Sequence, residues 1–139
     1  MGPTMPGINQ HEWLNAFINA SATIWEKAAV DIEEPQHKAV SYDPDGNVIL
    51  ADTGDTAIGL ILSPHRDPIY AGAPVNILIK YIGLLTTSEE LLKGDPITIT
   101  TGGIAQKAVS GDFIFGWAFS HALPDETVHV QITKSGYMA

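Results

Sequence analysis

The chain has 139 residues, which fits one domain with a modest extension, and its 45% apolar content is typical of a globular protein rather than a disordered one. Its formal charge is −9, no two basic residues are adjacent, and no apolar run approaches the roughly 20 residues of a membrane-spanning helix, so we expect binding to neither nucleic acid nor membrane. The lack of Cys excludes disulfides, thiol catalysis and cysteine metal sites.

Residues 1–36 are predicted to form an N-terminal arm with an amphipathic helix from about residue 10 to residue 30. Apolar side chains recur there at helical spacing: Trp13, Phe17, Ile24 and Ala28. Asn9 and Glu12 have the spacing of a capping box, and Pro35 ends the segment.

The arm has two possible roles. Its helix either packs on the chain's own β domain or docks onto a partner or a sister subunit, because large aromatic side chains are good interface anchors. The candidate interface residues are Trp13, Phe17 and Trp25.

From residue 37 onward the pattern changes to short strands and turns, and it occurs twice at a constant offset of 57 positions. Matched residues include two turn glycines, two Gly-Asp turns and two strand glycines: Gly46 and Gly103, Gly54-Asp55 and Gly111-Asp112, Gly59 and Gly116. Each copy is too short to bury its own apolar face, so we expect the two copies to pack together.

The sequence therefore predicts a mainly β fold, a small internally repeated β-barrel or β-tulip-like domain with an N-terminal helical arm. The domain spans residues 37–134, with pseudo-repeats at about 38–80 and 95–133, and residues 135–139 form a C-terminal tail. Between the repeats, the segment from Thr87 to Gly94 is predicted to form one short helical turn.

No motif predicts a catalytic, cofactor or metal site. His65-Arg66-Asp67 lacks the other motifs of a kinase and is interpreted as a polar loop. Asp43-Pro44-Asp45-Gly46 departs from the calcium-loop pattern and is predicted to be a turn. The five histidines lack metal-ligand spacing. We expect a protein that is not an enzyme and holds no cofactor.

The turns and strands resemble those of the bacteriophage capsid decoration proteins, the head-stabilising or cement proteins of the lambda-like group. The resemblance covers about residues 37–133 and rests on a running pattern of turns: Gly94-Asp95-Pro96-Ile97, Gly102-Gly103-Ile104-Ala105, Gly111-Asp112 with Gly116-Trp117-Ala118, and Asp125 to Val130. It leaves out the N-terminal arm.

This resemblance implies a viral structural protein of the virion, located on the outer capsid surface. Such proteins are commonly homotrimers at threefold positions, where they bind the major capsid protein and stabilise the head. A trimer would make weak single contacts durable through multivalency.

A carbohydrate-binding module of the β-clip type is the alternative function. It would require an exposed aromatic platform, for which Trp117, Phe119 and Tyr81 are the candidates. Under the decoration interpretation, Trp117 and Phe119 are expected in the core or in a subunit interface.

Overall fold

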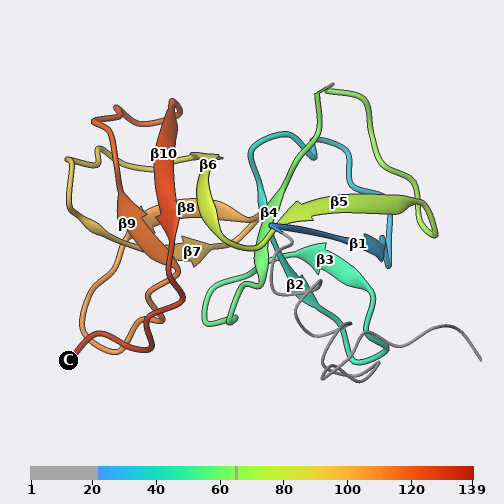
Figure 1. The fold of residues 1–139 in the computed structure, drawn as a ribbon, viewed down its shortest axis with the longest axis horizontal. Coiled ribbons are helices and arrows are strands. Elements are labelled where there is room, and N and C mark those ends of the chain that lie inside the picture. The colour runs from blue at the N-terminus through green and yellow to red at the C-terminus, as the bar shows by residue number, and fades with distance from the viewer. Residues whose placement is uncertain (1–21, 65) are drawn as a thin grey trace, which may run out of the picture.

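The computed structural model describes residues 22–64 and 66–139, and this part of the chain contains ten strands and no helix. The strands form two antiparallel sheets of five, which lie side by side (Figure 1). The first sheet has the order β1-β5-β4-β2-β3, and its strands are β1 (Thr23–Lys27), β2 (Ala39–Tyr42), β3 (Val48–Leu50), β4 (Gly59–Ile61) and β5 (Pro74–Leu78). The second has the order β6-β10-β9-β7-β8, and its strands are β6 (Tyr81–Thr86), β7 (Pro96–Thr100), β8 (Ile104–Lys107), β9 (Gly116–Ala118) and β10 (Thr127–Ile132).

The two sheets are equivalent units, and each begins with a strand, β1 or β6, that lies ahead of the repeat bounds expected from the sequence, about 38–80 and 95–133. The two sheets have the same strand order, with β1 in the place of β6 and β5 in the place of β10. Equivalent parallel bridges join Ala28 to Val48 and Thr87 to Ala105. The described part of the chain is thus mainly β and consists of two equivalent five-stranded units.

Neither sheet closes into the predicted barrel. In the described residues, edge strand β3 meets the segment after β1 through the single bridge between Ala28 and Val48. The second sheet has the same arrangement at Thr87 and Ala105. One bridge cannot supply the continuous ladder that barrel closure requires.

The predicted N-terminal helix does not extend to residue 30, because Thr23–Lys27 form strand β1 in register with β5. Residues 1–21, which carry the rest of that prediction, lie outside the described residues. The helical turn predicted from Thr87 to Gly94 is also wrong. The Thr87 hydroxyl donates to the Glu89 carbonyl oxygen at 2.7 Å, and Leu91 pairs with Ala122 in an antiparallel bridge.

The Gly-Asp turns are confirmed in both repeats. The Asp55 carboxylate accepts the backbone N–H of Asp52 at 2.9 Å, and the Asp112 carboxylate accepts that of Val109 at the same distance. The turn predicted at Asp43 is confirmed too, because its carboxylate accepts the N–H groups of Asp45 and Asn47. These carboxylates satisfy turn backbones, as Asp side chains commonly do.

Alternation within the strands defines the core of each repeat. In β10, Val128, Val130 and Ile132 are buried while the residues between them are exposed. One apolar cluster lies within the first sheet, and a second joins the core of the second sheet to residues of the first sheet, including Leu60 and Leu78.

Backbone hydrogen bonds hold the two repeats together. The Gly103 carbonyl oxygen accepts the Ala39 N–H at 2.8 Å, and the Gly103 N–H donates to the Ala51 carbonyl oxygen at 2.8 Å. The Thr101 hydroxyl donates to the Asp52 carboxylate at 2.7 Å. The tip of the β7–β8 hairpin is thereby fixed between β2 and the residue that follows β3.

The Asp52 contact predicts an acid-sensitive repeat junction. The hydrogen bond from Thr101, followed by that from the Thr53 N–H, lowers the pKa of Asp52 below its usual value near 3.8. A lowered folded-state pKa gives a contribution that is present above pH ~4 and is lost as pH falls through the folded pKa. We expect Asp52→Asn to lower the thermal midpoint at pH 7, and the difference from wild type to vanish at pH 2. A difference that persists undiminished at pH 2 would contradict this assignment.

Candidate interaction surfaces

The predicted anchors fall in different parts of the chain. Trp25 lies at the middle of β1 opposite Asn76, and its side chain is 65% exposed. Trp13 and Phe17 lie outside the described residues. The beginning of the first repeat therefore presents one large aromatic side chain to solvent.

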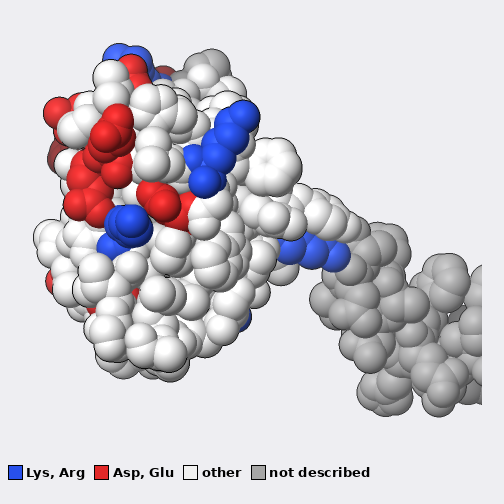
Figure 2. All heavy atoms as spheres, turned by 90° about the vertical axis from the view of Figure 1, so that its left-hand side faces the viewer, with Lys and Arg blue, Asp and Glu red and all other residues white. Residues whose placement is uncertain are grey.

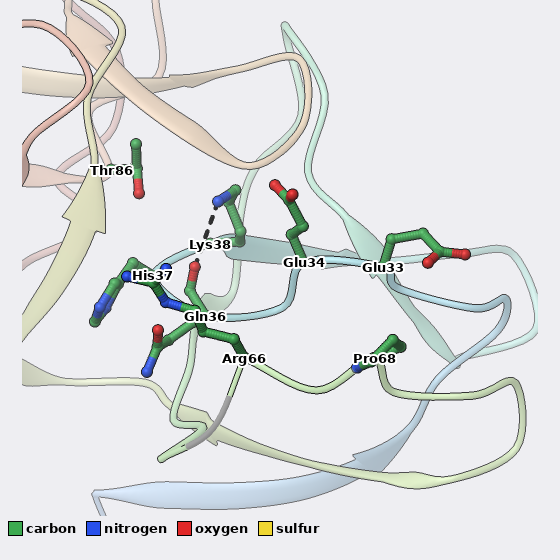
Figure 3. A pocket seen from close by; sticks show the side chains of 8 residues that line it. All are labelled: Glu33, Glu34, Gln36, His37, Lys38, Arg66, Pro68 and Thr86. Carbon is green, nitrogen blue, oxygen red and sulfur yellow. Dashed lines mark hydrogen bonds between the residues drawn. The ribbon is translucent and has the colours of Figure 1, made fainter.

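A polar hollow of about 440 Å³ opens beside the first sheet. It is formed by the segment before β2, the loop between β4 and β5, and the end of β6. Its lining residues are Glu33, Glu34, Gln36, His37, Lys38, Arg66, Pro68 and Thr86. Figure 3 shows that both cations and both carboxylates come from neighbouring segments rather than from one strand. The lining groups suit hydrogen bonding to a polar partner.

His37 is the conformationally unusual residue of this hollow. Its φ of 60° lies in the left-handed region, and its carbonyl oxygen accepts the Thr86 N–H at 3.0 Å. Partial burial, and then the nearby charges of Lys38 and Arg66, lower the pKa of its imidazole below 6.5. The neutral form of the ring is therefore favoured, and the hollow also contains one Lys, one Arg and two Glu side chains.

His37→Gly is expected to stabilise the fold by up to about 1 kcal/mol. A non-glycine residue in the left-handed region costs about 1–2 kcal/mol, and part of that gain is offset by the greater unfolded-state freedom of glycine. The equivalent residue of the second repeat is Gly94, with a φ of 89°. Urea titration of His37→Gly and of the matched Gly94→Ala, which should lose about 1 kcal/mol, measures both effects. A destabilised His37→Gly would show that contacts of the imidazole outweigh the backbone strain.

A second candidate surface lies on the outer face of the second sheet, the side turned away from its core. Trp117 in β9 pairs with Gln131 in β10, and Gln131 pairs with Ile82 in β6. Phe119 follows β9 and donates its N–H to the His129 carbonyl oxygen. We call this surface the aromatic face and define it by six outward residues: Ile82, Leu84, Trp117, Phe119, His129 and Gln131.

The aromatic face contains an open hollow of about 490 Å³. Its lining residues are Lys93, Gly94, Trp117, Ala118, Phe119 and Gln131. Phe119 is 56% exposed and Trp117 is half-buried, so neither is a core residue, and the subunit interface that was the other expectation stays a prediction. The lining is mainly aromatic and aliphatic, and it suits the burial of an apolar group.

Tyr81 does not belong to this face. It pairs with Ile132, whose side chain points into the core, and Lys80 lies over its ring at 5.2 Å. The three aromatic residues proposed from the sequence therefore form no common platform. Ile82, Leu84 and Gln131 were missed because their orientation depends on strand register.

Charges are unevenly distributed over the side of the second repeat. Figure 2 shows carboxylates gathered beside basic side chains in one part of this side and a broad uncharged area next to them. One close pair is Lys107 with Asp95, at 3.8 Å. Another is His121 with Glu90, at 2.9 Å. Within residues 22–64 and 66–139, no three His, Asp or Glu side chains are grouped as metal ligands. No helix in the same residues is long and apolar enough to cross a bilayer.

The sequence matches no known protein family and no curated protein. The structure is similar to the head fiber gp8.5 N base of bacteriophage phi29, with a TM-score of 0.61 and 17% sequence identity. The similarity covers 84% of this chain and 98% of that one. The two chains share a fold.

Proposed function

We propose that this chain is a non-enzymatic structural protein of a bacteriophage head. The observation that carries the proposal is the fold shared with the phi29 head fiber base, over nearly the whole of that chain. The turn pattern noted in the sequence points to the same class of protein from separate observations. The acidic composition suits exposure to solvent and disfavours contact with packaged DNA.

In its specific form, the proposal places the protein on the outer surface of the head, bound to the major capsid protein. There it stabilises the lattice as homotrimers at threefold positions. Two compact β units supply a rigid body, and trimeric attachment would make individually weak contacts durable. Trp13, Phe17 and Trp25 are the proposed arm anchors.

Co-sedimentation with expanded, undecorated heads tests this proposal. Saturation near one copy per capsid subunit supports trimers that cover the lattice. Saturation at a much lower ratio, as expected for a fiber base at a subset of positions, overturns lattice stabilisation but keeps the attachment to the head. No binding at any concentration overturns both. Combined Trp13→Ala and Trp25→Ala substitutions should weaken attachment while the circular dichroism spectrum stays unchanged, and loss of that spectrum would contradict the anchor role.

A carbohydrate-binding module remains the second candidate, favoured by the exposure of Phe119 beside Trp117 on the aromatic face. Aromatic rings in an open hollow can stack against a sugar ring, and Gln131 and Lys93 stand at its edge. A glycan-array screen of the wild type and Phe119→Ala separates this function from head attachment. Wild-type signals that the substitution removes would support it.

A further inference from the structure

The two repeats pack through non-equivalent surfaces. A surface that is buried in one repeat is therefore exposed in the other. On the outer face of the first sheet, Leu60 and Leu78 are 1% and 8% exposed, because the second repeat covers them. A Cβ atom added to Gly83 in β6 would lie 2.7 Å from the Leu60 side chain and 2.8 Å from that of Leu78. The leucines thus fill the place that a side chain at Gly83 would occupy.

The aromatic face is the equivalent surface of the second sheet, and nothing in the described residues covers it. Leu60 pairs with Leu78 as Trp117 pairs with Gln131, which makes these pairs equivalent. Phe119 stands in the place of the half-exposed Leu62, 57 positions earlier. A surface that is buried in the first repeat is therefore enlarged and exposed in the second.

A second copy of the chain cannot cover the aromatic face by repeating the internal contact. The Ala39 N–H that binds Gly103 has Pro96 as its equivalent, and proline has no N–H. The Thr101–Asp52 hydrogen bond has Pro44 and Val109 at the equivalent positions, so it has no counterpart. The steric match is lost as well.

The steric match of the internal contact is lost at Gly83, because the equivalent residue of the first repeat is Ile24. Gly83 pairs with Val130 as Ile24 pairs with Ile77. An isoleucine at this position fills the space that receives Leu60 and Leu78 in the internal contact. A second copy therefore cannot extend the two-unit array through the internal contact, and any occupant of the aromatic face must bind it in another way.

Charge indicates the chemistry of that occupant. Lys93 lies at the edge of the aromatic hollow, and no hydrogen bond or ion pair of its ammonium occurs within residues 22–64 and 66–139. It is one of only seven Lys and Arg residues in a chain of net charge −9. The lining of the hollow includes Trp117 and Phe119 and has no carboxylate.

We propose that the aromatic face binds a segment of another protein that inserts an apolar side chain beside Phe119 and places a carboxylate against Lys93. An apolar group flanked by a carboxylate satisfies both features of the hollow, whereas a wholly polar ligand would leave the rings uncovered. This inference rests on the proposed function, under which the partner is the capsid subunit.

Matched variants test the aromatic face. Their affinity for expanded heads is measured by co-sedimentation and compared with that of the wild type. Phe119→Ala and Lys93→Glu should each weaken binding by roughly tenfold. The controls are Tyr70→Ala, an aromatic residue 66% exposed on the first repeat, and Lys107→Glu, the same charge change outside the hollow. They should change affinity less than about twofold.

The outcomes separate the two proposals. Wild-type binding that survives Phe119→Ala and Lys93→Glu overturns the aromatic face as the contact but leaves head attachment standing. Lack of wild-type binding overturns head attachment itself. Glycan binding that depends on Phe119, or a self-association that Phe119→Ala abolishes in sedimentation velocity, replaces the proposed occupant with a sugar or a second copy.

Crosslinking then identifies the contact. The chain has no Cys, so Phe119→Cys introduces a single thiol for a photoreactive label. Irradiation on the head should link it to a peptide of the capsid subunit that contains an apolar residue next to Asp or Glu. A crosslinked peptide without a carboxylate would overturn the assigned role of Lys93.

Discussion

Replacing Gly116 with Ala is expected to lower the free energy of unfolding by about 3 kcal/mol, near the upper end for overpacked cores. An alanine Cβ at this position would lie 2.2 Å from the Gln131 carbonyl oxygen. The Cβ position is fixed by the backbone of β9 and the carbonyl oxygen belongs to the backbone of the paired strand β10, so a rotamer change cannot relieve the contact. Urea denaturation followed by tryptophan fluorescence gives the change in free energy.

The repeat supplies an independent test of the same physical cause. Gly59 is the equivalent glycine, and its Cβ would lie 2.2 Å from the Leu78 carbonyl oxygen, so Gly59→Ala should cost a similar amount. Gly111 is the control, because it has open space around it and a φ of 89°. Gly111→Ala should cost about 1 kcal/mol through backbone strain alone. If Gly116→Ala costs no more than Gly111→Ala, close approach is not the reason for glycine at these positions.

The repeat could be predicted because its turns require particular residues. Gly54-Asp55 and Gly111-Asp112 combine a left-handed glycine with a carboxylate that accepts a turn N–H, and few other residue pairs do both. The alternation of apolar and polar residues in β10 was equally predictable, because one face of the strand is buried and the other is exposed.

The first strand of each repeat was not predicted from the sequence, for a different reason in each case. Ile24 in β1 and Ala28 directly after it continue the spacing of Trp13 and Phe17, so a strand was interpreted as the end of a helix. The last strand of the first repeat, β5, and the first strand of the second, β6, form one apolar run. The strands break at Ile79 and Lys80, and Tyr81 begins β6 with a φ of 71° without glycine. Tertiary contacts set these conformations, and local propensity does not record them.

The aromatic face was only partly predictable. Trp117 and Phe119 were recognisable as aromatic residues, but their exposure depends on which surface the other repeat covers. That choice is made by Gly83, Gly103 and Ala39, which allow close approach at the internal contact. The equivalent residues Ile24 and Pro96 prevent it elsewhere, so the asymmetry between identical folds arises from a few small side chains.

The junction between the repeats yields a prediction of strong coupling. Leu60→Ala should cost about 3 kcal/mol, because it empties a fully buried site. Gly83→Ala alone should cost about 1–3 kcal/mol, because its new Cβ would meet the Leu60 and Leu78 side chains at 2.7 and 2.8 Å. In the double variant the added methyl group enters the space that Leu60 leaves. The cost of the double variant should therefore be smaller than the sum of the two single costs by at least about 1 kcal/mol.

A control keeps this double-mutant cycle specific to the junction. Val40 is fully buried in the other apolar cluster, within the first sheet. The costs of Val40→Ala and Gly83→Ala should therefore add within about 0.5 kcal/mol. Additive costs for Leu60 and Gly83 as well would mean that the leucine does not occupy the place of a side chain at Gly83. With coupling, a single unfolding transition is also expected, because residues of the first repeat complete the core of the second across this contact.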